Sequence, residues 1–214
     1  MKGYIKKLLR ENLEPLKPKI KLDDETKNMV GDLIGSGKDH FIFQHKNDSK
    51  KIVKVAFDGE DGNKWGPSDK VQTNLDTSHI EAFQNNPNLF AKVYEVNDRY
   101  AIIDKLKTDT IRDDQNEIFN ILGQVNHPDL DYMTKDTAIE RLYWVSANRR
   151  GFIDKLVRKL VKTGLFFQSA KVQLYIDFIR RIIESPLGKK MKNLDITNNN
   201  IGYDANGRLK LLDF

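Results

Sequence analysis

Cysteine is absent from the 214 residues of this sequence, so neither disulfide bonds nor thiolate-bound metals can stabilise the fold. The absence suits a reducing compartment, and we expect the protein in the cytoplasm. No apolar run approaches the roughly 18 residues that a membrane-spanning helix needs, so no membrane span is predicted. The first ten residues are basic but lack a long apolar stretch and a cleavage site, which argues against a signal peptide.

A large excess of one charge is also missing. The sequence has 36 basic and 31 acidic residues, a net charge of +5, and both signs are interspersed. Such a surface attracts acidic partners only mildly. The most basic stretch, residues 149–162, has apolar residues at helical spacing and predicts a packed helix with a basic outer face. Because no aromatic stacking surface or base-reading motif accompanies it, nucleic acid is not an expected partner.

The first half of the chain is predicted to be rich in strands. Apolar residues alternate with polar ones in several short runs, which is the pattern of half-buried strands. Residues 1–28 are expected to form an N-terminal extension that begins as a helix. Pro15 and Pro18 interrupt the helical pattern, so its later part is expected to be a loop. The predicted strands cover residues 30–34, 41–45, 51–57, 89–96 and 100–106, and a short helix is expected over 77–85.

The second half is predicted to be helical and to end in a hairpin. The clearest helix covers 168–184, where apolar residues line one side. The pair Asn206-Gly207 predicts a two-residue turn between strands at 201–203 and 209–212. The whole pattern indicates an α+β fold with a boundary near Lys107, which divides the chain into 29–106 and 107–214 after the extension.

Two carboxylates and an amide lie at the ends of this hairpin. Asp195 and Asn200 precede it, and Asp213 follows it. Because the hairpin returns the chain toward its start, Asn200 and Asp213 are expected to meet, and their oxygens suit Mg²⁺. An acid that orients a hydroxyl, together with an amide and an acid on Mg²⁺, is what phosphoryl transfer requires.

A glycine pair lies upstream, between two predicted strands. Gly35, Ser36 and Gly37 can bring backbone N–H groups close to phosphates, although most such sequences are simple hairpin turns. Lys54 follows in the middle of the next strand. It is either an outward lysine on an edge strand or a lysine that binds phosphate.

These motifs, in this order, resemble those of eukaryotic-like protein kinases. The resemblance covers nearly the whole chain and implies a two-lobe fold, in which a small antiparallel sheet with one helix precedes a helical lobe containing the catalytic loop. It implies ATP and Mg²⁺ as cofactors and a protein as substrate or partner. The implied site residues are Gly35, Ser36, Gly37 and Ile42 over the phosphates, Lys54 on them, Glu81 paired with Lys54, Ile103, Asp104 and Leu106 in an adenine-binding hinge, Asp195 as catalytic acid/base, and Asn200 and Asp213 on the metal.

The sequence departs from the kinase pattern at several places. The catalytic loop reads Asn-Leu-Asp before Ile196 in place of His-Arg-Asp, and Thr197 replaces a lysine typical of serine/threonine kinases. The sequence ends at Phe214, without the segments that follow D-F-G in the family. Helices over about 113–163 are expected to replace part of the missing lobe. Such compact divergent kinases resemble those encoded by phages or viruses, whose location would be the host cytoplasm.

Three functions remain open at this point. The first is a protein serine/threonine kinase, and the second is a small-molecule phosphotransferase of the same broad fold. The third is a pseudokinase that acts as a binding or assembly module, which the altered catalytic loop favours. The joint presence of Lys54, Glu81, Asp195, Asn200 and Asp213 argues against the third. The sequence predicts no oligomeric state.

Overall fold

The computed structural model describes residues 19–36, 39–59, 69–77, 83–186, 196–197 and 200–212. The chain forms two compact units: unit 1 contains Met1–Ser78 and Val93–Ile103, and unit 2 contains His79–Lys92 and Asp104–Phe214. Strands dominate the first unit and helices the second, so the predicted α+β class is confirmed.

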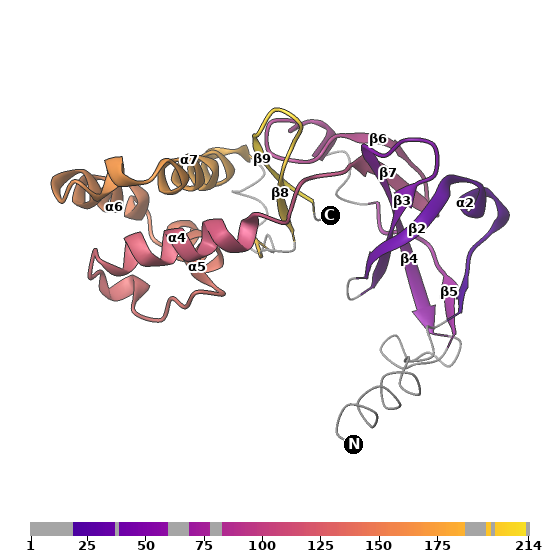
Figure 1. Cartoon of the computed structure of the whole chain (residues 1–214), viewed down its shortest axis with the longest axis horizontal. Coiled ribbons are helices and arrows are strands. Elements are labelled where there is room, and N and C mark those ends of the chain that lie inside the picture. Colours follow the sequence, from indigo (N-terminus) through magenta and orange to yellow (C-terminus); the bar gives the residue numbers. More distant parts are fainter. Residues whose placement is uncertain are drawn as a thin grey trace, which may run out of the picture. The chain divides into compact units, whose positions relative to one another are not determined.

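Unit 1 is built on a curled, mainly antiparallel sheet (Figure 1). The path β1-β5-β4-β3-β2 runs through neighbouring strands, and β7 pairs with both β4 and β6. The β1–β5 pairing is parallel, and the β2–β3, β3–β4, β4–β5 and β6–β7 pairings are antiparallel. The strands are β1 (Ile20–Lys21), β2 (Val30–Ser36), β3 (His40–His45), β4 (Lys51–Gly59), β5 (Lys70–Gln72), β6 (Val93–Val96) and β7 (Tyr100–Asp104).

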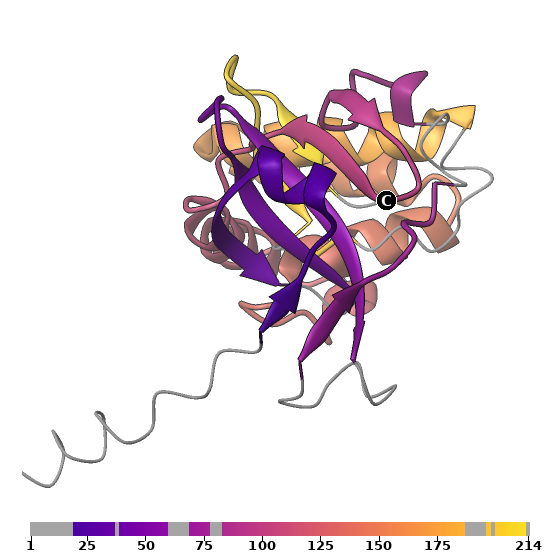
Figure 2. The ribbon, with the colours of Figure 1, turned by 90° about the vertical axis from the view of Figure 1, so that its right-hand side faces the viewer.

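One face of this sheet carries the core of unit 1. Successive side chains of a strand point to opposite faces, so the apolar alternation read from the sequence buries every second residue. The rings of Phe41 and Phe57 stack with centroids 4.0 Å apart. Figure 2 shows the twist of the strands that present these side chains. The core residues are Phe41, Phe43, Val53, Val55, Phe57, Tyr100 and Ile102.

The beginning of unit 1 differs from the prediction of a helical extension over 1–28. Residues 1–18 lie outside the described residues, but β1 already pairs with β5 of the sheet. Asp23 then caps the short helix α2 (Asp24–Met29), accepting a hydrogen bond from the Thr26 backbone at 2.7 Å. The Asp23 backbone N–H donates to the Gln72 side chain at 2.9 Å. Residues 20–28 therefore belong to the sheet unit, because their partners lie far along the chain, where a local pattern cannot show them.

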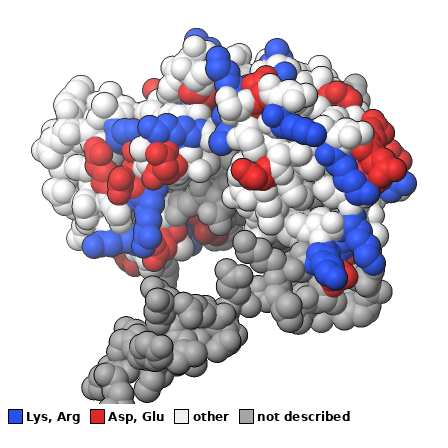
Figure 3. Space-filling model, turned by 45° about the vertical axis from the view of Figure 1, so that its right-hand side comes forward, with Lys and Arg blue, Asp and Glu red and all other residues white. Residues whose placement is uncertain are grey.

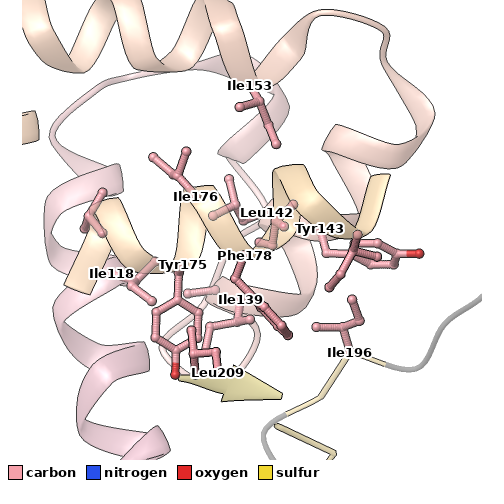
Figure 4. Packing of buried hydrophobic residues seen from close by; sticks show 14 of the residues in the cluster. Ile118, Ile139, Leu142, Tyr143, Ile153, Tyr175, Ile176, Phe178, Ile196 and Leu209 are labelled. Carbon is pink, nitrogen blue, oxygen red and sulfur yellow. The ribbon is translucent and has the colours of Figure 1, made fainter. Parts of the chain in front are cut away.

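In the described part of unit 2, four long helices and a hairpin pack around one core. Figure 4 shows Ile118, Leu142, Phe178 and Leu209 together in this core, so the hairpin shares it with the helices. The elements are α4 (Ile111–Gly123), η1 (Pro128–Leu130), α5 (Ala138–Asn148), α6 (Phe152–Lys162), η2 (Leu165–Gln168), α7 (Ala170–Glu184), β8 (Ile201–Tyr203) and β9 (Leu209–Leu211).

Two predicted helices are confirmed. The helix expected over 168–184 is α7, which begins after the cap Ser169, whose hydroxyl accepts from the Val172 backbone at 3.0 Å. The basic stretch forms α6, which buries Phe152, Leu156 and Leu160 and exposes its lysines and Arg158. This helix therefore uses its apolar side for packing, as its spacing predicts.

The strand predicted over 89–96 is shorter than expected, since β6 covers only Val93–Val96. The Ala91 N–H donates to the Leu211 carbonyl, and the Leu211 N–H donates to the Leu89 carbonyl, both at 2.8 Å. These bonds place residues 89–91 beside β9 in unit 2. The predicted division at 29–106 thus differs from the structure, in which His79–Lys92 belongs to unit 2.

Basic and acidic side chains alternate in small groups on the face shown in Figure 3. No helix among the described residues combines the length and apolar character that a bilayer span requires.

Candidate nucleotide and metal site

The glycine motif and Lys54 lie on neighbouring strands in matching register. In the β2–β3 pair, Gly35 faces Ile42, and in the β3–β4 pair Ile42 faces Lys54. Ser36 ends β2 and His40 begins β3, so Gly35 and Ser36 of the predicted phosphate-binding motif are the last two residues of β2. Three residues far apart in the sequence therefore form one row across the sheet.

Lys54 is buried in the interior of the sheet. Strand β4 has β3 on one side and pairs with β5 and β7 as well, so it is not an edge strand. The Lys54 residue is only 5% exposed. The alternative of an outward lysine on an edge strand is therefore wrong. Lysine is rarely buried to this degree without an interacting group, and Lys54 does have electrostatic or hydrogen-bonding neighbours.

Ile103 belongs to the same face of the sheet as Ile42 and Lys54. The core face holds Phe41 and Phe43 of β3, Val53 and Val55 of β4, and Ile102 of β7. Alternation then places Ile42, Lys54 and Ile103 on the opposite face. Ile103 is 1% exposed and lies in β7, which pairs with β4. Ile103 and Lys54 therefore put an apolar side chain and an ammonium group on adjacent strands, on one face of the sheet.

The predicted hinge coincides with a passage between the two units. The chain leaves unit 1 after Ile103 and enters unit 2 at Asp104. Within unit 2, the Asp104 N–H donates to the Lys92 carbonyl at 2.9 Å, and Leu106 is buried.

Gly37 and Glu81 lie outside the described residues, so the predicted Lys54–Glu81 pair stays a prediction.

The predicted catalytic and metal-binding residues belong to unit 2, where backbone contacts fix the described ones. Ile196, directly after Asp195 in the sequence, is 1% exposed and belongs to the helical core (Figure 4). The Asn200 N–H donates to the Thr197 carbonyl at 3.0 Å. The Leu212 N–H donates to the Asn200 carbonyl at 2.8 Å. Asn200 thus lies beside Leu212, the neighbour of Asp213 in sequence.

The hairpin that makes this contact has a longer loop than predicted. Tyr203 pairs with Leu209, and the Gly207 N–H donates to the Asp204 carbonyl at 2.9 Å. Gly207 alone in this loop has a positive φ, of 73°, whereas the predicted two-residue turn needs two such residues. The Asp204 carboxylate accepts from the Asn206 and Arg208 backbones, both at 2.9 Å, and this favours the longer loop.

Asp195 and Asp213 lie outside the described residues. Of the two predicted metal ligands, Asn200 is therefore the one that the structure describes. Within the described ranges, no three His, Asp or Glu side chains gather where they could hold a metal ion. The donor chemistry of an amide and a carboxylate nevertheless fits Mg²⁺, which binds few protein oxygens and keeps several waters. The Asn200–Leu212 bond is the feature of the structure that supports this fit.

The backbone on the C-terminal side of the hinge is joined to the hairpin. Lys107 and Tyr203 exchange two backbone hydrogen bonds, each 2.9 Å long. Gly202 lies so close to this segment that an added Cβ would be 2.6 Å from the Leu106 Cβ. Glycine is therefore required at position 202 for the hairpin to lie against residues 106–108.

A buried polar cluster lies beside this hairpin and was not predicted from the sequence. The Asp114 carboxylate in α4 is surrounded by groups from α7 and β8. It accepts from the Tyr175 hydroxyl at 3.1 Å and from the Tyr203 hydroxyl, and it pairs with the Lys171 ammonium at 2.9 Å. The Lys171 ammonium also donates to the Tyr203 hydroxyl at 3.1 Å. A polar residue at an otherwise buried helical position, as Asp114 is in α4, is the one local signal that could have revealed it.

The cluster holds its members in defined protonation states. Burial is the main cause that raises the pKa of Tyr175, and interactions with Tyr203 and Asp114 raise it further. Burial also raises the pKa of Tyr203, as does its hydrogen bond to Asp114. For Lys171, burial lowers the pKa, but hydrogen bonds with Asp114 and Tyr203 outweigh this effect and the pKa is raised. The tyrosines therefore stay protonated donors and Lys171 stays charged at neutral pH.

No protein-family model, curated protein or solved structure matches this chain.

Proposed function

We propose that this chain is an ATP- and Mg²⁺-dependent phosphotransferase with a kinase-like two-lobe fold, and that its acceptor is a serine or threonine hydroxyl of a protein. The observation that carries the proposal is the buried Lys54, which lies in register with Ile42 of β3 and, across β3, with Gly35 of β2. The serine or threonine acceptor comes from the kinase resemblance alone.

Each of the proposed nucleotide-binding residues contacts the part of ATP that suits its chemistry. Backbone N–H groups around Gly35, Ser36 and Gly37 surround the phosphates, and Lys54 balances their charge. Ile42 and Ile103 provide apolar surface for the base, and the backbone of Asp104 and Leu106 offers polar groups to its edge. Glu81 orients Lys54.

The amide of Asn200 and the carboxylate of Asp213 would hold Mg²⁺, which neutralises charge on the phosphate oxygens. Asp195 orients the acceptor hydroxyl. The hydroxyl oxygen forms a bond to the γ-phosphorus while the bond from that phosphorus to the β,γ-bridging oxygen breaks. ADP leaves, and the hydroxyl proton passes to Asp195. Positioning and charge balance supply the rate enhancement in such a reaction.

The proposal is tested by thermal unfolding with ATP alone, MgCl₂ alone and both together. Wild-type protein is expected to gain stability only with both. A hundredfold excess over Kd corresponds to about 2.7 kcal/mol, or roughly 5–10 °C for a chain of this size. Lys54→Met should lose this gain. The matched control is Lys51→Met on the same strand, since Lys51 is partly exposed and pairs with Asp48 at 3.2 Å.

Transfer itself is measured with γ-labelled ATP on a protein mixture and on a pool of metabolites. Label on proteins that disappears in Asp195→Asn is the expected result. Label on a metabolite alone would move the acceptor to a small molecule. A wild-type chain that binds no Mg²⁺-nucleotide would overturn the proposal in favour of a pseudokinase or assembly module.

A further inference from the structure

We propose that Asp114 is a positioning residue that acts through Tyr203 on the hairpin that carries Asn200. The inference rests on the proposed function to the extent that Asn200 holds Mg²⁺. The positional part, in which Asp114 orients the hairpin, stands on the contacts of unit 2 alone.

The Asp114 carboxylate joins three elements. Its helix is α4, Tyr175 and Lys171 come from α7, and Tyr203 ends β8. Tyr203 is used twice, since its hydroxyl donates to Asp114 and accepts from Lys171. The Lys171 ammonium also lies 4.8 Å from the centroid of the Tyr203 ring. The tyrosine side chain is therefore held at its hydroxyl and at its ring.

The hairpin needs such an anchor because it is small. Strands β8 and β9 have three residues each, and an isolated two-stranded hairpin of this length is not stable by itself in water. Its position must come from what it contacts. Asn200 directly precedes β8, so any shift of Tyr203 is passed along a two-residue stretch to Asn200. A metal ligand displaced by a fraction of an ångström loses affinity, as groups that orient ligands show.

The energetics favour orientation over stability as the role of Asp114. The Asp114 side chain, which is paired with Lys171, is only 5% exposed. Removing a carboxylate from water is costly. Apolar residues of similar volume commonly give equal or greater stability at such positions. A charge buried among directional hydrogen bonds instead fixes one geometry, here that of β8 against α4 and α7.

Tyr175 provides the matched control. Its hydroxyl donates to the same Oδ2 atom of Asp114 as that of Tyr203 and also interacts with the Tyr203 side chain, but Tyr175 belongs to α7 and not to the hairpin. Tyr203→Phe and Tyr175→Phe each remove one hydroxyl from the same carboxylate and keep the ring. Both variants leave the backbone bonds between Lys107 and Tyr203 in place, so the hairpin can still form.

The experiment measures two quantities on the full chain. The first is the Mg²⁺ concentration for half-maximal ATP binding, and the second is the hydrogen-exchange rate of the Leu212 amide, which donates to Asn200. Tyr203→Phe is expected to raise the Mg²⁺ requirement roughly tenfold and to speed exchange at Leu212. Tyr175→Phe should change both quantities less than Tyr203→Phe does, even where both variants lower the melting temperature equally.

Equal effects of the two variants, or no effect of Tyr203→Phe on the exchange rate, would overturn the inference. If wild-type protein binds no Mg²⁺-nucleotide, the proposed function fails, and the exchange rates still decide whether the cluster positions the hairpin. Asp114→Asn serves as the second variant. If it folds, it should reproduce the effects of Tyr203→Phe on both quantities.

Discussion

Single side chains decide how closely the segments of unit 2 approach, and Gly202 is the clearest case. A Cβ at this position would lie 2.6 Å from the Leu106 Cβ and 3.1 Å from both the Lys107 carbonyl oxygen and the Thr108 Cγ2. The first of these distances is shorter than two carbon atoms allow, and the second neighbour is backbone that cannot rotate away. Gly202→Ala must therefore push the hairpin away from residues 106–108.

We expect Gly202→Ala to lower the free energy of unfolding by about 1–3 kcal/mol, the usual cost of overpacking. Urea unfolding followed by circular dichroism measures the change. Gly123→Ala is the control, because nothing lies within 4 Å of an added Cβ at the end of α4, and alanine favours a helix. Equal stability of the two variants would contradict the close approach of residues 106–108 to Gly202.

The role of Lys54 can be interpreted only when its surroundings in the sheet are known. The sequence offers a lysine between valines, which fits an exposed edge strand equally well. The structure gives β4 neighbours on both sides and leaves Lys54 5% exposed. Burying an ammonium group in a sheet is costly without compensation, so this position favours a role for the charge.

At the scale of elements, the buried cluster joins α4, α7 and β8 and should make stability depend on alkaline pH. The pKa values of Tyr175 and Tyr203 are raised in the folded protein, mainly by burial. In the unfolded chain a tyrosine has a pKa of about 10. Above that pH the unfolded state loses protons that the folded state keeps, so the free energy of unfolding falls as pH rises. The stabilisation is fully present below about pH 10 and is lost above it.

Urea unfolding between about pH 9 and about pH 11 should therefore show a decline that Tyr175→Phe makes shallower. The raised pKa of Lys171 acts in the same direction, since its charged form is favoured by the folded state. Tyr132→Phe is the control, because Tyr132 is 81% exposed. An unchanged slope in Tyr175→Phe would show that the cluster does not hold the tyrosine protonated.

At the scale of the whole molecule, each unit has its own core. The larger one joins α4, α5, α6 and α7 with the hairpin and with Phe83, Leu89 and Phe90. The helices that we expected over 113–163, as a replacement for part of a kinase lobe, thus pack into the same core as the hairpin that carries Asn200. The basic outer face of α6 gives trypsin several sites without exposing the buried side.

Trypsin should therefore cut α6 slowly under native conditions, although Lys155, Arg158, Lys159 and Lys162 are exposed on it. Cleavage of a packed helix requires opening, so the rate at α6 should follow the loss of tertiary structure in urea. Mass spectrometry of timed digests measures it. Rapid cuts within α6 before any loss of tertiary structure would show that these helices are not part of a cooperative core.

Elements whose signals are local could be predicted from the amino-acid sequence alone. Apolar alternation predicts β3 and β4, helical spacing predicts α6 and α7, and a glycine in a turn predicts the final hairpin. The order of Gly35, Lys54, Asn200 and Asp213 led to the proposed chemistry. In each case the physical cause lies within a few residues, where the pattern of side chains is sufficient.

Tertiary structure decided what depends on distant partners. Residues 20–28 join the sheet through β5, residues 89–91 join unit 2 through Leu211, and the hairpin loop is longer because Asp204 bonds to its backbone. The cluster of Asp114, Lys171, Tyr175 and Tyr203 joins residues up to 89 positions apart. No short pattern marks such a cluster, because its geometry exists only after the helices and the hairpin have packed.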